Sequence, residues 1–241
     1  MSKIKWDQAG ERLFELGIDQ GVLYRHGSDP STQQYTEAYA WNGLTSVNEA
    51  PTGGEPNDQY ADNLKYVTLI GKENFAGTIN AYTYPEAFSA CDGTAAAATG
   101  LYISGQTREP FGLSYRTKVG NDTVGENFGY KLHLCYGLRC SPSDKSRETI
   151  NESPEAAEFS WDFTSTPVAI ETKKADGSLY EPTAHIVIDS TKLTSTAGKA
   201  ALKSLEDILY GTDPDTEAQT PGTAGYLPTI DYVLNLFKYV A

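Results

Sequence analysis

Three runs of alternating apolar and polar side chains in the middle of the chain constrain its fold more than any other feature. Their apolar positions are Phe111, Leu113, Tyr115 and Val119, then Leu132, Leu134, Tyr136 and Leu138, and finally Phe159, Trp161 and Phe163. A period of two places alternate side chains on opposite faces of a sheet, so each run predicts a half-buried β-strand. Gly120, Asn121 and Asp122 suit a turn after the first run, because such residues tolerate positive φ or bond their own backbone. Together the three strands predict the core of a β-sandwich, and they name no chemistry.

Shorter segments rich in β-favouring or alternating residues predict further strands around this centre. They span residues 21–25, 34–41, 64–70, 75–84, 168–171 and 184–189. A short helix is predicted over residues 85–91, where Pro85 suits the first turn, and a longer one over residues 196–210, whose apolar residues share one face. Residues 95–98 are interpreted as a connection of small residues, and residues 226–240 are too irregular to assign. This pattern indicates a mainly-β domain.

The length of 241 residues allows one large β domain, or one domain with an added lobe. We expect residues 1–172 to form a β-sandwich core, with a long loop at residues 42–63. Residues 173–241 are expected to supply a C-terminal strand, the longer helix and a tail that pack on the core or extend it.

The expected loop at residues 42–63 is the longest stretch without periodicity in the first half of the chain. Its charged residues are all acidic: Glu49, Glu55, Asp58 and Asp62. A loop this long is unusual in a compact domain, and such loops are normally functional or disordered. We expect the aromatic residues Trp41 and Tyr60 to anchor it to its own sheet.

The chain is acidic, with a formal net charge of -13. This balance argues against a protein that grips nucleic-acid phosphates, because Lys and Arg supply most of that affinity. It suits solubility, or a surface that repels a passing polyanion. No apolar run approaches the ~20 residues of a membrane span. The first residues do not form a hydrophobic signal core, so no export is expected.

The three cysteines, Cys91, Cys135 and Cys140, cannot all pair within one chain, and their spacing matches no zinc pattern. Cys135 and Cys140 are expected on opposite faces if their strand is regular. We therefore expect three reduced, structural cysteines in a protein made in the cytoplasm.

Neither the histidines nor the carboxylates predict an active site. His26, His133 and His185 are far apart and have no metal-ligand spacing, and a histidine on a strand, such as His133, is more often satisfied than catalytic. The motifs of a nucleophile elbow, a phosphate-binding loop and a zinc protease do not occur in the sequence. A glycosidase needs two carboxylates across a cleft, which the sequence cannot place. The aromatic strands could also form a carbohydrate-binding sandwich, although such residues more often fill a core.

Short motifs spread from about residue 6 to residue 236 carry a family resemblance. They are Trp6-Asp7-Gln8, Gly10-Glu11-Arg12, residues 41–47, Gly54-Glu55-Pro56, Tyr60-Ala61-Asp62-Asn63, residues 81–85, Gly120-Asn121-Asp122, residues 129–134, residues 159–163, Leu205-Glu206-Asp207, Tyr210-Gly211 and Leu227-Pro228. In this order the chain resembles the major tail tube proteins of long-tailed, non-contractile phages of Gram-positive bacteria.

The resemblance implies a β-sandwich with a flanking helix, six copies of which form a ring with a closed inner β-barrel. Rings would stack into the tail tube through which DNA passes during ejection, and the loop at residues 42–63 would contact basic residues of the next ring. The implied partners are further copies of the chain, the tape-measure protein, the tail terminator and distal tail proteins, with DNA only transient in the lumen. The implied location is the virion tail, assembled in the host cytoplasm. No catalytic residue, cofactor or metal is implied. The alternatives are a carbohydrate- or receptor-binding virion module and a glycosidase.

A tube that passes DNA needs a lumen that is negative or neutral. Four basic residues of the central strands would make the lumen more positive if they faced it: Arg116, Lys118, Lys131 and Arg139. We expect them to be offset by acids, to pair across subunits, or to face outward.

Overall fold

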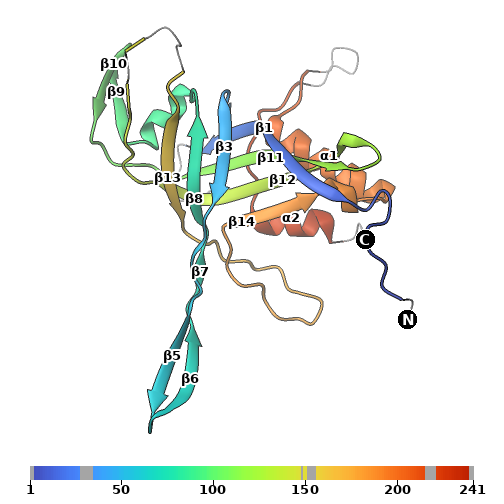
Figure 1. The fold of residues 1–241 in the computed structure, drawn as a ribbon. Coiled ribbons are helices and arrows are strands. Elements are labelled where there is room, and N and C mark those ends of the chain that lie inside the picture. Colours follow the sequence, from blue (N-terminus) through green and yellow to red (C-terminus); the bar gives the residue numbers. More distant parts are fainter. Residues whose placement is uncertain (1–2, 28–34, 148, 151–155, 215–220, 239–241) are drawn as a thin grey trace.

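The chain folds around one large antiparallel sheet. The computed structural model describes residues 3–27, 35–147, 149–150, 156–214 and 221–238, and its secondary structure is 47% strand and 14% helix. The strand order in the sheet is β2-β1-β11-β12-β13-β8-β3, and β14 pairs with β12 off this path (Figure 1). The strands are β1 (Leu13–Arg25), β2 (Glu37–Ala40), β3 (Leu44–Glu49), β8 (Ala76–Ala81), β11 (Phe111–Asn121), β12 (Gly125–Cys140), β13 (Phe159–Ser165) and β14 (His185–Asp189). The predicted mainly-β class is confirmed.

The three alternating runs of the sequence are β11, β12 and β13, which lie side by side at the centre of the sheet. The sheet buries a separate cluster on each of its two faces. The inner core gathers residues of β1, β3, β8, β11, β12 and β13, and includes Leu23, Ile79, Phe88, Phe111, Leu113, Trp161 and Phe163. The helix-side core gathers residues of β1, β12, β14 and the C-terminal helices, and includes Tyr24, Leu132, Leu134, Leu205, Leu209 and Val233. Parts of β11 and β12 are therefore buried on both sides, whereas β13 alternates between buried and exposed residues.

β12 changes its partner strand along its length. Its residues 131–135 pair with β14, and its residues 138–140 pair with β13. Between these segments Gly137 has a φ of 63°, and the register against β11 shifts, which marks a β-bulge. The bulge overturns the expectation for Leu138, and it removes the condition of a regular strand on which the placement of Cys135 and Cys140 depended. Leu138 faces the inner core rather than the side of Leu132, and Cys135 and Cys140 lie in the same core instead of on opposite faces.

Two α-helices cover the face of the sheet formed by β1, β12 and β14 (Figure 1). Helix α1 (Thr196–Tyr210) has the predicted bounds, and the Ser195 hydroxyl caps its first turn by accepting a hydrogen bond from Gly198 N at 3.0 Å. Helix α2 (Ile230–Phe237), capped by Thr229, forms within the segment that the sequence left unassigned. The last residues of that segment lie outside the described chain. The predicted short helix is a 3-10 helix, η2 (Glu86–Ala90), and a second 3-10 turn, η3 (Ser190–Lys192), follows β14.

The expected loop at residues 42–63 is wrong, because most of this segment is β-strand. It contains β3, then β4 (Thr52–Gly53), which pairs with β7 (Glu73–Asn74), and β5 (Pro56–Ala61), which pairs with β6 (Leu64–Ile70). The β5–β6 turn is Asp62-Asn63, with φ of 50° and 63°, as a two-residue type I′ turn requires. Figure 1 shows this hairpin reaching away from the body, and we call residues 50–75 the arm.

A second hairpin projects from the body, near the opposite end of Figure 1 from the arm. It consists of β9 (Thr94–Ala98) and β10 (Leu101–Ser104), so residues 95–98, expected to be a connection, are a strand. The strand predicted at residues 168–171 is also wrong, because only an isolated bridge from Val168 to Thr183 forms there. Among the described residues, no helix is both long enough and apolar enough to cross a membrane.

Candidate functional site

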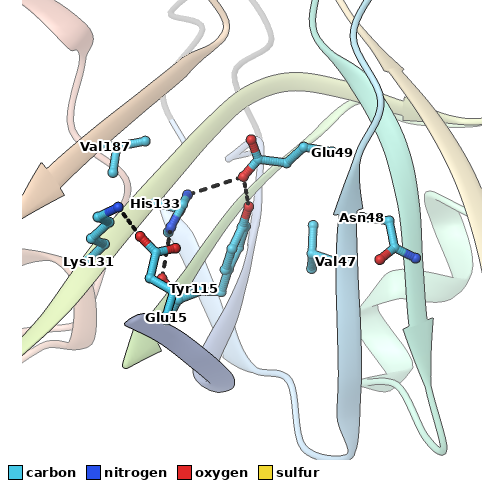
Figure 2. A pocket seen from close by; sticks show the side chains of 9 residues that line it. Glu15, Val47, Asn48, Glu49, Tyr115, Lys131, His133 and Val187 are labelled. Carbon is cyan, nitrogen blue, oxygen red and sulfur yellow. Dashed lines mark hydrogen bonds and ion pairs between the residues drawn. The ribbon is translucent and has the colours of Figure 1, made fainter. Parts of the chain in front are cut away.

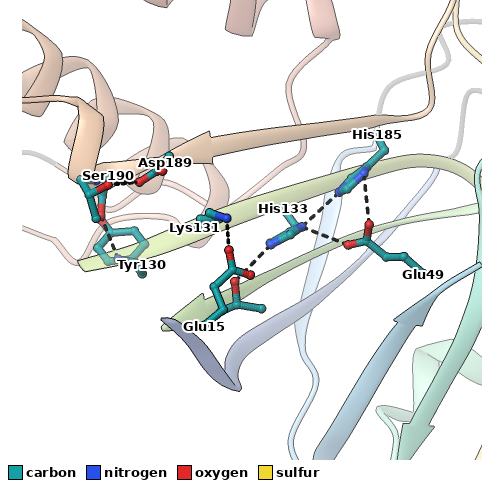
Figure 3. A network of polar contacts seen from close by, with 10 residues as sticks. Glu15, Glu49, Tyr130, Lys131, His133, His185, Asp189 and Ser190 are labelled. Atoms are coloured by element: carbon teal, nitrogen blue, oxygen red, sulfur yellow. Dashed lines mark hydrogen bonds and ion pairs between the residues drawn. The ribbon is translucent and has the colours of Figure 1, made fainter. Parts of the chain in front are cut away.

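A pocket of about 550 Å³ opens between β3 and the central strands β11 and β12 (Figure 2). It is lined by Glu15, Val47, Asn48, Glu49, Tyr115, Thr117, Lys131, His133 and Val187. The lining therefore comes from five strands, β1, β3, β11, β12 and β14. Four of its side chains, Glu49, Tyr115, Thr117 and His133, form one polar network, and Lys131 pairs separately with Glu15 (Figure 3).

Glu49, the last residue of β3, is the acid at the centre of this network. Its Oε1 lies 3.3 Å from His133 Nδ1 and accepts a hydrogen bond from the Tyr115 hydroxyl at 2.7 Å (Figure 2). The contact with His133 is the largest of the effects that lower the pKa of Glu49 to about 2; burial opposes it, and Tyr115 adds to it. Glu49 is therefore a stable carboxylate at neutral pH, although 38% of its side chain is exposed.

His185 on β14 brings a second imidazole to the same carboxylate. Its Nε2 lies 3.2 Å from His133 Nδ1, and its Nδ1 lies 3.9 Å from Glu49 Oε2 (Figure 3). Burial lowers the pKa of His185 to about 4; Glu49 opposes this shift, and His133 reinforces it. His185 is thus neutral at neutral pH, which leaves one ring nitrogen with a free lone pair.

Aromatic and hydroxyl neighbours fix the orientation of both imidazoles. The Tyr115 ring stacks on His133 with centroids 4.5 Å apart, and the Phe75 ring stacks on His185 at 4.4 Å. Thr117 Oγ1 lies 3.2 Å from His133 Nε2, on the side of the ring away from Glu49. Burial, the largest cause, raises the pKa of Tyr115, so its hydroxyl remains a donor to Glu49.

Strand register explains how these residues meet. Tyr115 lies directly opposite His133 across the β11–β12 ladder. On the other side of β12, His133 pairs with Val187 and Cys135 pairs with His185, so the two histidines are diagonal neighbours on one face of the sheet. These histidines have no metal-ligand spacing along the chain, because pairing between distant strands brings them together.

The two aromatic residues expected to anchor the segment at residues 42–63 differ in burial. Trp41 is buried in the inner core as expected; its ring centroid lies 4.6 Å from that of Phe88, and its Nε1 donates to Thr83 O at 3.0 Å. Tyr60 is 70% exposed on the arm, so the expectation that it anchors the segment is wrong.

The four acidic residues of that segment lie in different surroundings. Glu49 faces the pocket, and Asp58 pairs with Lys65 of its own hairpin at 2.7 Å, which lowers the pKa of Asp58. Glu55 and Asp62 are exposed on the arm. Contact of these acids with a neighbouring ring stays a prediction.

Two of the four basic residues of the central strands are paired with acids of β1. Arg116 binds Asp19 with an Nε–Oδ1 distance of 2.9 Å, and Lys131 forms an ion pair with Glu15. Arg139 donates to the carbonyl of Arg108, and Lys118 is exposed. Acids of the same chain thus offset Arg116 and Lys131.

All three cysteines are free and buried, as predicted. No family model matches the sequence, and no curated protein matches it. A functional assignment therefore depends on the residues and geometry described above.

Proposed function

We propose that this protein is a structural subunit of a virion, a major tail tube protein that polymerises as stacked hexameric rings around a channel for DNA. The motif resemblance supports this proposal, and so does the arm, which presents an apolar surface that the rest of its own chain does not cover. The arm is the observation that carries the proposal.

The arm exposes six large apolar side chains to solvent. They are Tyr60 at 70%, Leu64 at 72%, Tyr66 at 79%, Val67 at 41%, Leu69 at 55% and Ile70 at 73% exposure. Contiguous apolar patches on a soluble protein mark surfaces that bind another molecule. A lone two-stranded hairpin is also marginally stable, so the arm gains most from a partner that covers it. A neighbouring subunit in a stack supplies such a partner.

The β9–β10 hairpin carries a second apolar surface, formed by Leu101, Tyr102 and Ile103. Because this hairpin and the arm project from separate parts of the body (Figure 1), one subunit can contact more than one neighbour. Head-to-tail contacts of this kind generate rings when the rotation closes. Pairing of the edge strands β2 and β3 with those of neighbouring copies would close the inner barrel and remove exposed sheet edges.

Charge is consistent with a channel for DNA. The net charge of -13, with Arg116 and Lys131 held by acids, favours a lumen that does not retain a polyanion. Under this proposal the chain has no substrate, and its partners are other copies, the tape-measure protein, the tail terminator and distal tail proteins. The lowered pKa of Glu49 also makes it unsuited to act as the general acid of a glycosidase.

Electron microscopy of the purified protein tests the proposal. Concentrated or seeded wild-type protein is expected to form rings or tubes, whereas a Tyr66→Ser/Ile70→Ser variant is expected to remain monomeric with an unchanged circular dichroism spectrum. A Leu179→Ser/Tyr180→Ser variant is the matched control, because it removes two exposed apolar side chains away from the arm. Wild-type protein that stays monomeric under every condition, including seeding with tail-tip complexes, would overturn the proposal.

A further inference from the structure

Glu49, His133 and His185 form a set of metal-binding donors. Each offers one ligand atom, and these three atoms lie within 4.8 Å of one another. The three residues come from β3, β12 and β14, so three separate strands of the fold are needed to build the set. Two imidazole nitrogens and one carboxylate oxygen suit zinc and similar transition metals, whereas magnesium and calcium prefer oxygen ligands alone.

Two of the three distances between the donors fit a tetrahedral ion. With metal–ligand bonds of ~2.0–2.1 Å, two ligands of a tetrahedral zinc site lie about 3.3 Å apart. His133 Nδ1 lies 3.3 Å from Glu49 Oε1 and 3.2 Å from His185 Nε2. Two edges of the donor triangle therefore already have the length that a bound zinc ion requires.

Neighbouring groups hold the donors as the outer shell of a metal site does. A metal-binding histidine commonly donates its other ring N–H to an oxygen, and a metal-binding carboxylate is commonly hydrogen-bonded. Thr117 Oγ1 lies 3.2 Å from His133 Nε2 and can accept its N–H, and this tautomer would leave the Nδ1 lone pair for a metal ion. The Tyr115 hydroxyl donates to Glu49, and Phe75 stacks on His185.

We propose that Glu49, His133 and His185 bind one divalent transition-metal ion, with zinc as the best match. Three protein ligands leave a fourth position, and Glu49 and His133 both line the pocket, so that position faces solvent. Glu49 ends β3 immediately before the arm, whereas both histidines belong to the central sheet. The ion would thus tie the base of the arm to the body. The inference does not depend on the proposed function, because it concerns the folded monomer.

The competing explanation is a hydrogen-bonded network without an ion, in which His133 Nδ1–H is shared between Glu49 and His185. Equilibrium dialysis of the full-length, folded chain against micromolar ZnCl2 separates the two explanations. We expect one zinc per chain in the wild type and at least a ~100-fold weaker affinity in Glu49→Gln and His185→Gln, because loss of an outer-shell contact alone already costs 10–100-fold. His26→Gln is the matched control, since it removes the one histidine outside the set, and it should bind zinc as the wild type does.

CoCl2 provides a second readout that identifies the ligands. Tetrahedral Co2+ bound to nitrogen and oxygen gives d–d absorption without the charge-transfer band of a thiolate, which excludes binding by the three cysteines. Tyr115→Phe should weaken zinc binding about 10-fold while leaving all three ligands in place. Glu49 is partly exposed, so Glu49→Gln is the variant least expected to disturb folding. If the wild type binds no zinc, or if Glu49→Gln and His185→Gln bind it as tightly as the wild type, the cluster is a hydrogen-bonded network only and the proposal fails.

Discussion

Gly137 lies directly against the backbone of Thr166, at the point where β12 exchanges β14 for β13. A Cβ atom at Gly137 would come 2.6 Å from the Thr166 carbonyl oxygen, and the Gly137 φ of 63° already disfavours any other residue. Thr166 N donates to Gly137 O at 3.0 Å, so neither backbone can move away easily. Gly137 therefore allows β12 to pair with both β14 and β13, and the bulge at this residue turns the Leu138 side chain towards the inner core.

Replacing Gly137 by alanine is expected to destabilise the protein by more than backbone strain alone. A non-glycine residue in the left-handed region costs on the order of 1–3 kcal/mol, and the contact with Thr166 adds to that. The free energy of unfolding, measured by denaturant titration, should fall accordingly.

Gly125→Ala is the matched control for this prediction. Gly125 also belongs to β12 and has a φ of 80°, but no atom lies within 4 Å of the position that its Cβ would take. It should therefore report the backbone strain alone. Equal losses of stability in the two variants would show that the contact with Thr166 does not matter.

Helix α1 and the three central strands could be predicted because their signals are local. Leu202, Leu205 and Leu209 recur at helical spacing and face one core, and the strands alternate over many residues. In the arm, only the strand at residues 64–70 could be predicted in this way, and it is confirmed as β6, whereas β5 lies within the segment expected to be a loop. The apolar residues of the arm lie on a ribbon that its own body leaves exposed, so burial imposes no clear alternation on them, and Pro56 and neighbouring glycines resemble loop residues. The bulge at Gly137 likewise has no signal beyond one glycine.

The candidate site was missed because it is assembled by long-range pairing. His133 and His185 are 52 positions apart, and they meet only because β14 adds to the edge of β12. Glu49 joins them because β3, the edge strand after β8 in the sheet, also lines this pocket. The acid content of residues 42–63 did single out Glu49, but for a contact with another subunit rather than with its own histidines.

The inner core depends on Phe88, which η2 inserts among aromatic rings. Phe88 is fully buried, and its ring centroid lies 4.6 Å from that of Trp41 and 5.1 Å from that of Trp161. Phe88→Ala is expected to cost about 3–5 kcal/mol in unfolding free energy, because it leaves a cavity that rigid rings cannot fill. Ile103→Ala, at a side chain that is 51% exposed, should change it by no more than ~0.5 kcal/mol. Similar losses in both variants would contradict this assignment of the core.

Burial of the thiols predicts their reactivity and its pH dependence. Burial, the largest cause, raises the pKa of Cys91 to about 12 and also raises the pKa values of Cys135 and Cys140. In the unfolded chain a thiol ionises near ~8.5, so the unfolded state binds fewer protons than the folded state between that pH and about 12. The contribution of the protonated thiols to the free energy of unfolding is therefore complete below pH ~8.5, and it is lost as the pH rises from there towards about 12.

Alkylation measures this directly, because the thiolate is the reactive form. At pH 8 the folded protein should react negligibly, and after unfolding three thiols per chain should react. Rapid reaction of the folded protein at pH 8 would contradict the burial of these side chains.

The last prediction concerns the order of the arm before and after assembly. As a two-stranded ribbon, the β5–β6 hairpin is expected to be marginally stable in the free chain and to be protected once a neighbouring subunit covers its apolar side chains. Hydrogen exchange should therefore be fast at residues 56–70 in the monomer and slow in the assembled protein, with the β11–β12 amides as an internal reference.

The β5–β6 turn offers a way to change the stability of the arm without altering its apolar surface. Asn63 has a φ of 63°, so Asn63→Gly should slow exchange in the free arm, whereas Asn63→Val, which places a β-branched residue in the left-handed region, should accelerate it. Equal protection of residues 56–70 in the free and assembled protein would show that assembly does not order the arm, and unchanged exchange in Asn63→Val would show that this turn does not hold it together.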